Sequence, residues 1–151
     1  MYLIFGSFLC IICYALLISY SEASVAYAAV FLGAMGAFPV GPGFISWGVN
    51  NAAGASVRAV SAAYIVSVGT IGAIIATWTY LPEDGPRYRT GHSINLGAQA
   101  GISVISVIGV LYVQWENSLR ARGGRDTRLV GKLEQEIRVL GDRHPSFRYM
   151  A

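Results

Sequence analysis

The chain has 151 residues, of which 54% are hydrophobic and 13% are charged, and its formal net charge is +3. An ordinary soluble domain carries roughly 25% charged residues, so this composition excludes a water-soluble fold with polar outer faces. Eight of the eleven basic residues follow Glu116. The positive charge therefore belongs to one terminal segment, and no nucleic-acid partner is needed to explain it.

Charged side chains are missing from several long stretches of the sequence. Glu22 is the sole Asp, Glu, Lys or Arg before Arg58, and none occurs at 59–82 or 90–115. A helix needs about 20 apolar residues to cross a hydrocarbon core of about 30 Å. The sequence therefore predicts an all-α integral membrane protein with a transmembrane region over 1–116 and a tail over 117–151. Its four transmembrane helices are expected at about 2–20, 25–48, 58–80 and 94–115.

The first predicted helix contains both cysteines, Cys10 and Cys13. Their spacing can serve metal or redox chemistry, but no further ligand is near in the sequence, so we interpret them as packing residues and predict no metal or cofactor. This helix also resembles a signal peptide, because small residues follow it. No basic residues precede it, and it is longer than the usual apolar segment of a signal peptide, so a retained membrane helix is favoured.

The second predicted helix contains two prolines close to polar side chains. Proline removes a backbone donor and clashes with the preceding turn, so this helix should bend or open there. An interrupted helix beside polar groups is typical of a transport path. The alternative is that each polar side chain bonds within its own helix. The candidate substrate-cavity residues are Pro39, Pro42, Ser46 and Trp47, with Thr70 in the third helix.

Small residues are frequent in the fourth predicted helix. Gly97 and Gly101 form a G-x-x-x-G pattern that Gly109 continues, and such residues allow close helix approach in lipid. We interpret them as helix-packing residues within a bundle, with homodimerisation as the alternative. No Asp, Glu or His is expected deep in a span, because His92 is assigned to a loop at 81–92. The sequence therefore offers no internal group for proton coupling.

The tail is expected to contain one helix between Asp126 and Gly141, with its leucines on one face. This amphipathic helix would lie on the membrane surface, or it would dock another protein. The tail and Arg58 carry nine basic residues, whereas Arg87 and Arg89 are the two on the opposite face. The positive-inside rule therefore places both termini and the loop between the second and third helices in the cytoplasm.

Several motifs in order resemble a known family. Residues 38–39, 46–54 and 58–60 resemble fungal carriers of the anion:cation symporter family, the allantoate permease-like members of the major facilitator superfamily. Residues 82–88, 91–92 and 95–97 resemble the loop between that family's last two helices, and residues 144–150 are also similar to its C-terminal tail.

The resemblance implies that the four helices are the last four of a twelve-helix carrier in the plasma membrane. Such carriers import a small organic anion or vitamin by alternating access with proton symport. The second helix would then line the cavity. The resemblance assigns a cytoplasmic gate motif to Asn50, Asn51, Gly54 and Arg58, and an outer-loop motif to Asp84, Pro86, Arg87 and Tyr88.

We therefore expect a fragment of a transporter and no enzyme. Its partners would be the lipid bilayer, the remaining carrier helices and, in the full-length context, a small organic anion, with no nucleic acid. Alone it should transport nothing, because a carrier cavity needs both halves. The alternative hypothesis is a small non-transporting membrane scaffold or regulator that associates with carriers through its glycine-rich helix faces.

Overall fold

The computed structural model describes residues 2–150, apart from the side chains of Tyr2 and Arg138. Its helices are α1 (Tyr2–Ser19), α2 (Ala23–Asn50), α3 (Ala55–Trp78), α4 (Arg89–Ala121) and the short α5 (Glu134–Arg138). Three 3₁₀ turns accompany them: η1 (Pro82–Asp84), η2 (Asp126–Leu129) and η3 (Gly141–Arg143). The all-α prediction is confirmed, since the described residues form no strand.

Three helices of the described chain, α2, α3 and α4, are long and apolar enough to cross a membrane. Helix α1 is apolar but shorter, with 18 residues that extend about 27 Å. Helix α4 has 33 residues and extends about 50 Å, well beyond a hydrocarbon core of about 30 Å. Its charged final turns, with Glu116 and Arg120, follow the uncharged stretch 90–115, which is itself long enough to cross that core.

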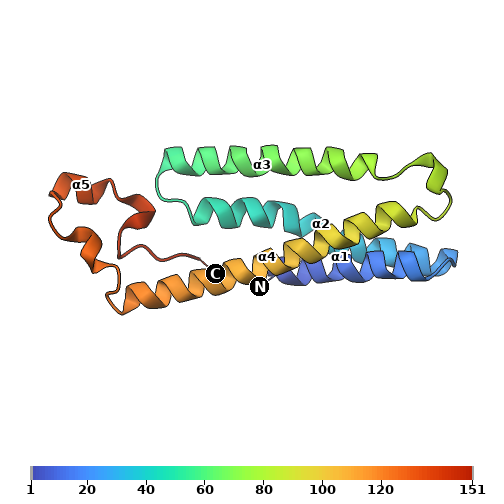
Figure 1. Ribbon diagram of the computed structural model, residues 1–151, viewed down its shortest axis with the longest axis horizontal. Helices are drawn as coiled ribbons and strands as arrows, with labels where there is room; N and C mark the ends of the chain where they lie inside the picture. Colours follow the sequence, from blue (N-terminus) through green and yellow to red (C-terminus); the bar gives the residue numbers. More distant parts are fainter. Residues whose placement is uncertain (1, 151) are drawn as a thin grey trace.

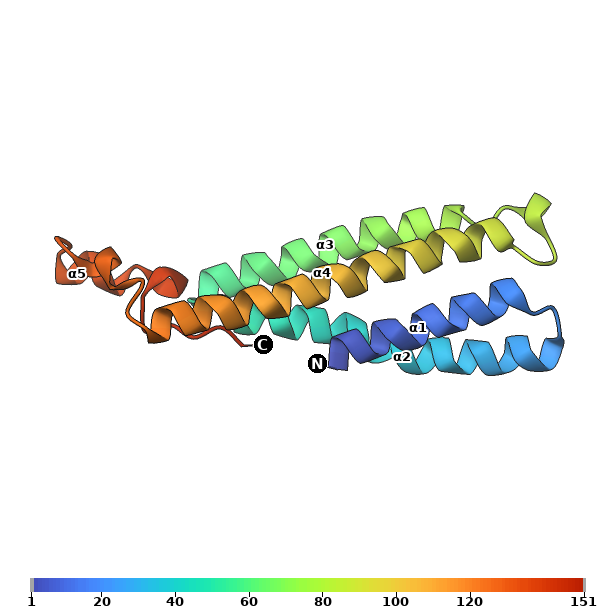
Figure 2. The ribbon, with the colours of Figure 1, turned by 60° about the horizontal axis from the view of Figure 1, so that its bottom comes forward.

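The helices run along one elongated bundle with two distinct ends (Figure 1). Residues 51–54 and 122–150 gather at one end, which we call the tail end. Residues 20–22 and 79–88 connect the helices at the opposite end, which we call the loop end. Helices α1 and α2 lie side by side, and α4 crosses α1 (Figures 1 and 2).

The α1–α2 pair packs closely because glycines face each other. A Cβ added at Gly36 would lie 2.5 Å from the carbonyl oxygen of Gly6, and one added at Gly33 would lie 2.7 Å from the Cys13 sulfur. Cys10 and Cys13 are both free and buried in this interface, and the Cys10 thiol donates to the Gly33 carbonyl at 3.6 Å. The cysteines thus pack between the two helices.

Helix α3 packs much less than the others. None of its described residues is buried, and its neighbour is α2. Helices α3 and α4 overlap in Figure 2, but Figure 1 shows them separating toward the tail end. Large apolar side chains such as Tyr64, Ile71 and Trp78 are exposed. A helix that is apolar all round is suited to lipid or to further membrane helices.

Helix α2 continues through Pro39 and Pro42 without a break. Its ribbon bends about midway, as Figures 1 and 2 show. The sequence predicted a bend or an opening at these prolines, and the structure shows the bend. Both prolines are exposed on the surface of the described bundle.

Two expectations about boundaries were wrong. Helix α4 begins at Arg89, so His92 lies in its first turn and not in a loop. The continuous tail helix is also absent: residues 126–143 form η2, α5 and η3 instead. Gly131 interrupts them with φ of 76°, a left-handed conformation that glycine adopts at no steric cost and that ends a helix.

Candidate functional site

The tail end brings α2, α4 and the last residues of the tail together. The Trp47 indole on α2 donates to the Met150 carbonyl at 2.8 Å. The Asn51 side-chain amide donates to the same carbonyl at 3.1 Å, and its oxygen accepts a hydrogen bond from the Met150 N–H at 2.6 Å. We call this arrangement the tail clasp; its members are Trp47, Asn51, Glu116, Asn117, Arg120, Tyr149 and Met150.

Asn117 on α4 repeats this pairing one residue earlier in the tail. Its amide group donates to the Tyr149 carbonyl at 2.7 Å and its side-chain oxygen accepts the Tyr149 amide at 2.9 Å. An asparagine side chain carries both a donor and an acceptor, so it can satisfy a whole residue of main chain. Asn51, just after α2, and Asn117 on α4 thus hold two successive tail residues through the main chain.

Arg120 is the centre of the tail clasp. One terminal nitrogen of its guanidinium donates to three tail carbonyls, those of Asp142 at 2.9 Å, His144 at 3.3 Å and Phe147 at 3.0 Å. Its guanidinium carbon lies 4.6 Å from the centroid of the Tyr149 ring, a cation–π distance. The residue is only 4% exposed. This nitrogen carries two N–H groups, so at least one of them is shared between two carbonyls.

Glu116 balances the buried charge of Arg120. Its carboxylate accepts from the Arg120 Nε at 2.9 Å and from the Arg125 Nη2 at 2.7 Å. The hydrogen bonds from Arg125, and then those from Arg120, lower the pKa of Glu116 to about 2, although burial acts in the opposite direction. The carboxylate is therefore ionised at neutral pH. Buried charges are tolerated when they are paired and hydrogen-bonded in this way.

The turn between α2 and α3 positions Asn51 for the clasp. Asn51 also donates to the Trp47 carbonyl at 3.0 Å, which fixes the end of α2. Gly54 has φ of 92°, a conformation that favours glycine, and Arg58 donates to the Ala52 carbonyl at 3.0 Å. Gly54 and Arg58 therefore shape the turn, whereas Asn51 contacts the tail directly.

The remaining polar candidates on α2 lie around the clasp. Asn50 donates to the Ser46 hydroxyl at 3.4 Å and lies 3.8 Å from the Met150 sulfur. Ser46 is exposed. The Trp47 ring covers Gly109 of α4, where an added Cβ would lie 3.1 Å from it. Gly109 thus lets the indole fill the gap between α2 and α4.

Thr70 does not take part in this cluster. Its hydroxyl donates to the Val66 carbonyl of its own helix at 2.9 Å, and the side chain is exposed. The two glycines expected to pack α4 are also unpartnered within the described chain. A Cβ added at Gly97 or Gly101 would meet no atom within 4 Å. Any helix that packs there must come from outside this segment.

The outer-loop motif lies at the loop end. The Tyr88 amide donates to the Asp84 carbonyl at 2.9 Å, and Tyr88 adopts a left-handed φ of 41°. Pro86 and Arg87 line a hollow beside α1, together with His92. These residues define the conformation of the loop that leads into α4.

A second polar network at the loop end involves His92. The Tyr80 hydroxyl lies 3.2 Å from the His92 Nδ1, and Asn95 donates to that hydroxyl at 3.3 Å. The Tyr80 ring packs on Gly91, where an added Cβ would lie 2.8 Å from it. This network was missed because His92 was assigned to a loop.

The sequence interpretation also missed Glu116, Asn117, Arg120 and Tyr149. One signal was present: Glu116 and Arg120 stand four residues apart, directly after a long uncharged stretch, at the spacing of a helical ion pair. The tail residues that bind Arg120 lie more than 20 positions along the chain. No local sequence pattern indicates that the tail folds back onto α4.

Comparison with known proteins relates the chain to transporters. It is 27% identical over 149 residues to an uncharacterized transporter of Schizosaccharomyces pombe, which covers 98% of this chain and 28% of that protein. It is also 27% identical over 130 residues to the MFS-type transporter cnsO of Penicillium expansum, covering 83% of this chain and 25% of that protein.

These matches define how far the comparison reaches. The chain spans about a quarter of the length of the curated relatives it matches. No protein-family model matches it, and no solved structure matches it. Both relatives are named as transporters, which agrees with the expectation that the chain is not an enzyme. Together with the apolar helices, they support a membrane protein related to transporters, one of them of the MFS type.

Proposed function

We propose that the chain serves in a carrier of the major facilitator type that moves a small organic anion across a membrane. The observation that carries this proposal is the alignment with a named transporter over 98% of the chain. The long apolar helices supply the membrane-spanning elements that such a carrier needs. The substrate class, uptake with proton symport and the allantoate permease-like grouping rest on the motifs at 38–60 and 82–97.

In this proposal, residues 1–116 contribute the membrane region and residues 117–151 the tail, and further helices complete the carrier. The exposed surface of α3 and the open space at Gly97 and Gly101 support such partners. The hollows among the described residues include three in the tail and one at the loop end, and a carrier cavity is built from both halves of the carrier. Transport therefore requires the remaining helices.

We further propose that the tail end faces the cytoplasm and that the membrane is the plasma membrane. The fold gathers the basic tail and the α2–α3 turn at one end, with Arg87 and Arg89 near the other (Figure 1). This distribution follows the positive-inside rule. The tail clasp would then close the cytoplasmic side, and Trp47 on α2 and Asn51 in the α2–α3 turn would act as gate residues.

The test is deletion of the gene in the source organism, followed by uptake measurements. Labelled allantoate, ureidosuccinate, nicotinate and pantothenate would be supplied at acidic and neutral external pH. We expect lower uptake of one of these anions, strongest at acidic pH, and restoration by the intact gene. Unchanged uptake of all four anions would contradict the proposal. Uptake by cells that express residues 1–151 alone would contradict the need for further helices.

The open glycine face of α4 favours a second candidate function. Gly97 and Gly101 face empty space, as they would in a small scaffold that associates with a separate carrier. In that case the chain should co-purify with a full-length carrier, and Gly97→Leu should abolish the association. Monomeric behaviour of the intact chain in the membrane would exclude this candidate.

A further inference from the structure

A basic hollow lies in the tail, away from the clasp residues. Its lining consists of Thr127, Arg128, Val130, Lys132, Leu140 and Arg143, and its volume is about 490 Å³. Three of these six residues are cationic, and none of the described lining residues carries a carboxylate. We call it the tail hollow. Its lining is therefore positively charged.

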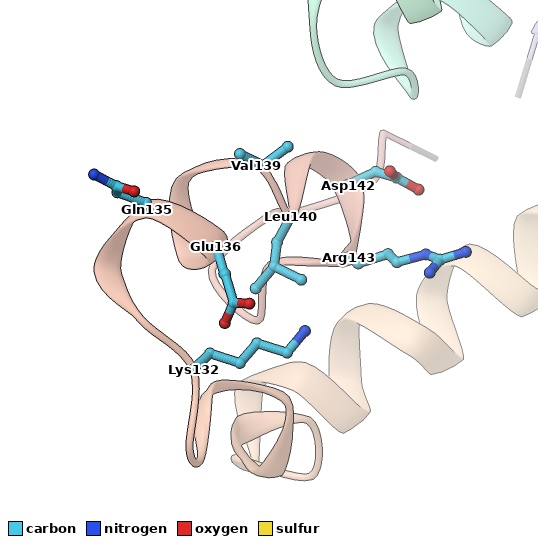
Figure 3. A pocket seen from close by; sticks show the side chains of 7 residues that line it. All are labelled: Lys132, Gln135, Glu136, Val139, Leu140, Asp142 and Arg143. Carbon is cyan, nitrogen blue, oxygen red and sulfur yellow. The ribbon is translucent and has the colours of Figure 1, made fainter.

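The fold, and not the local sequence, brings these cations together. Gly131 reverses the chain with φ of 76°, which places Lys132 beside η2. Arg128 donates to the Arg143 carbonyl at 3.2 Å, which joins η2 to η3 across 15 residues. Figure 3, which shows the neighbouring hollow, has the Lys132 side chain below Leu140 and the Arg143 side chain to its right. In an ordinary solvated segment, charged side chains would extend into water separately and would not be brought together in one hollow.

Among the described residues, no ion pair joins an acidic residue of the tail to a cation of the tail hollow. Glu136 and Asp142 line a neighbouring hollow that shares Lys132 and Arg143 (Figure 3). The Glu136 carboxylate accepts the Leu133 amide at 3.1 Å. Within the described residues, the ion pairs are those of Glu116 with Arg120 and Arg125. The cations of the tail hollow therefore remain available for an external anion.

The tail clasp fixes this hollow beside the end of α4. Arg120 holds the carbonyls of Asp142 and His144, the two neighbours of Arg143. Exposed Val130 lines the hollow, and Leu133, 72% exposed, lies next to Lys132. Cations beside exposed apolar side chains, close to where a helix leaves the membrane, suit the headgroup region of a bilayer.

We propose that the tail hollow binds a phosphate group, and that its source is the headgroup of an anionic phospholipid in the leaflet at the tail end. Arg128, Lys132 and Arg143 supply the charge, and the Thr127 hydroxyl supplies a further donor. Arginine pairs with phosphate through several hydrogen bonds, and lysine does so as a point charge. Membrane topology explains why the tail is basic, but not why three cations line one acid-free hollow.

The experiment uses the purified full chain in a neutral detergent, with calorimetric titration of dioctanoyl phosphatidic acid. Dioctanoyl phosphatidylcholine and inorganic phosphate serve as comparison ligands. We expect saturable binding of phosphatidic acid that weakens with added salt, and at least tenfold weaker binding of both comparison ligands. Lys132→Gln and Arg143→Gln should each weaken phosphatidic acid binding about tenfold, because each removes one charge-assisted contact.

Arg122→Gln is the matched control, because it removes the same charge from an exposed residue that does not line the hollow. It should change the affinity less than twofold. Equal weakening by Arg122→Gln, or equal binding of phosphatidylcholine, would overturn the proposal. Inorganic phosphate that binds as tightly as phosphatidic acid would overturn the lipid source. Lys132→Gln keeps the test valid if Arg143→Gln misfolds, since the Lys132 ammonium makes no hydrogen bond within residues 2–150.

Discussion

Helices α3 and α4 are both long and apolar, yet they differ in how far the rest of the chain buries them. The final turns of α4 are charged and buried, with Glu116 1% exposed and Arg120 4% exposed. Helix α3 has no buried residue along its described length. The polar side chains at the end of α4 are hydrogen-bonded by the chain's own tail. The apolar surface of α3 is left for lipid or for other helices to cover.

The reason lies in the solvent that each region meets. Within lipid, a helix satisfies its backbone internally, so α3 can remain unpacked without unpaired polar groups. At the tail end, water competes for every hydrogen bond, and a single exposed contact contributes little. The clasp therefore combines a buried ion pair, two asparagine pairings and an arginine that binds three carbonyls.

The largest expected effect comes from Arg120→Ala. Removing it leaves Glu116 buried with one partner fewer and frees three tail carbonyls, so we expect the docked tail to lose about 3 kcal/mol. Trypsin cleavage after Arg143 and Arg148 should become rapid in the detergent-solubilised chain. Arg122→Ala is the control and should leave cleavage slow. Slow cleavage of the Arg120→Ala variant would show that the clasp does not hold the tail.

Acidification should release the tail less completely than Arg120→Ala does. The pKa of Glu116 is lowered from its ordinary value of 4.5 to about 2 in the fold. Its contribution to the stability of the docked tail is therefore complete above pH 4.5. It is lost as the pH falls from there through 2. Hydrogen exchange of residues 142–150 should therefore accelerate, relative to its intrinsic rate, below pH 4.5. Glu116→Gln should abolish this pH dependence, and a persisting dependence in that variant would assign it to another group.

Single asparagine substitutions should have an intermediate effect. Asn117→Ala removes both main-chain hydrogen bonds of Tyr149, and Asn51→Ala removes two of the three at Met150, whose carbonyl keeps the Trp47 indole; each change has an expected cost of about 1–2 kcal/mol. Met150→Ala should cost less than Asn51→Ala, since the clasp binds the main chain. Hydrogen exchange of the Tyr149 and Met150 amides measures both. A larger effect of Met150→Ala would mean that the side chain is recognised instead.

The smallest effect is expected in α3. Ile71 is 58% exposed, so Ile71→Ala should change the unfolding free energy of the isolated chain by less than about 0.5 kcal/mol. Val113→Ala on α4 is the matched comparison, because Val113 is 5% exposed and its truncation leaves a cavity. Denaturation in mixed detergent measures both variants. A cost for Ile71→Ala equal to that for Val113→Ala would show that α3 is packed after all.

Part of the candidate site could be predicted from the sequence. Trp47 was singled out because it lies in an interrupted apolar helix beside polar groups, and the family resemblance added Asn51 as part of a gate motif. Their partner could not be predicted. The contacts to Met150 span about 100 residues and use its main chain, which every residue shares, so side-chain identity gives no signal. His92 was misplaced because helix boundaries cannot be read to within a few residues.

The sequence by itself determined that this is an all-α membrane chain, because long uncharged apolar stretches have the helix as their stable form in lipid. It also determined the basic tail and the polar groups at the end of α2. The tertiary structure alone decided that the tail returns to α2 and α4, that Arg120 is buried, and that three cations meet in the tail hollow. These features depend on the turn at Gly131 and on contacts between distant segments, which no local pattern specifies.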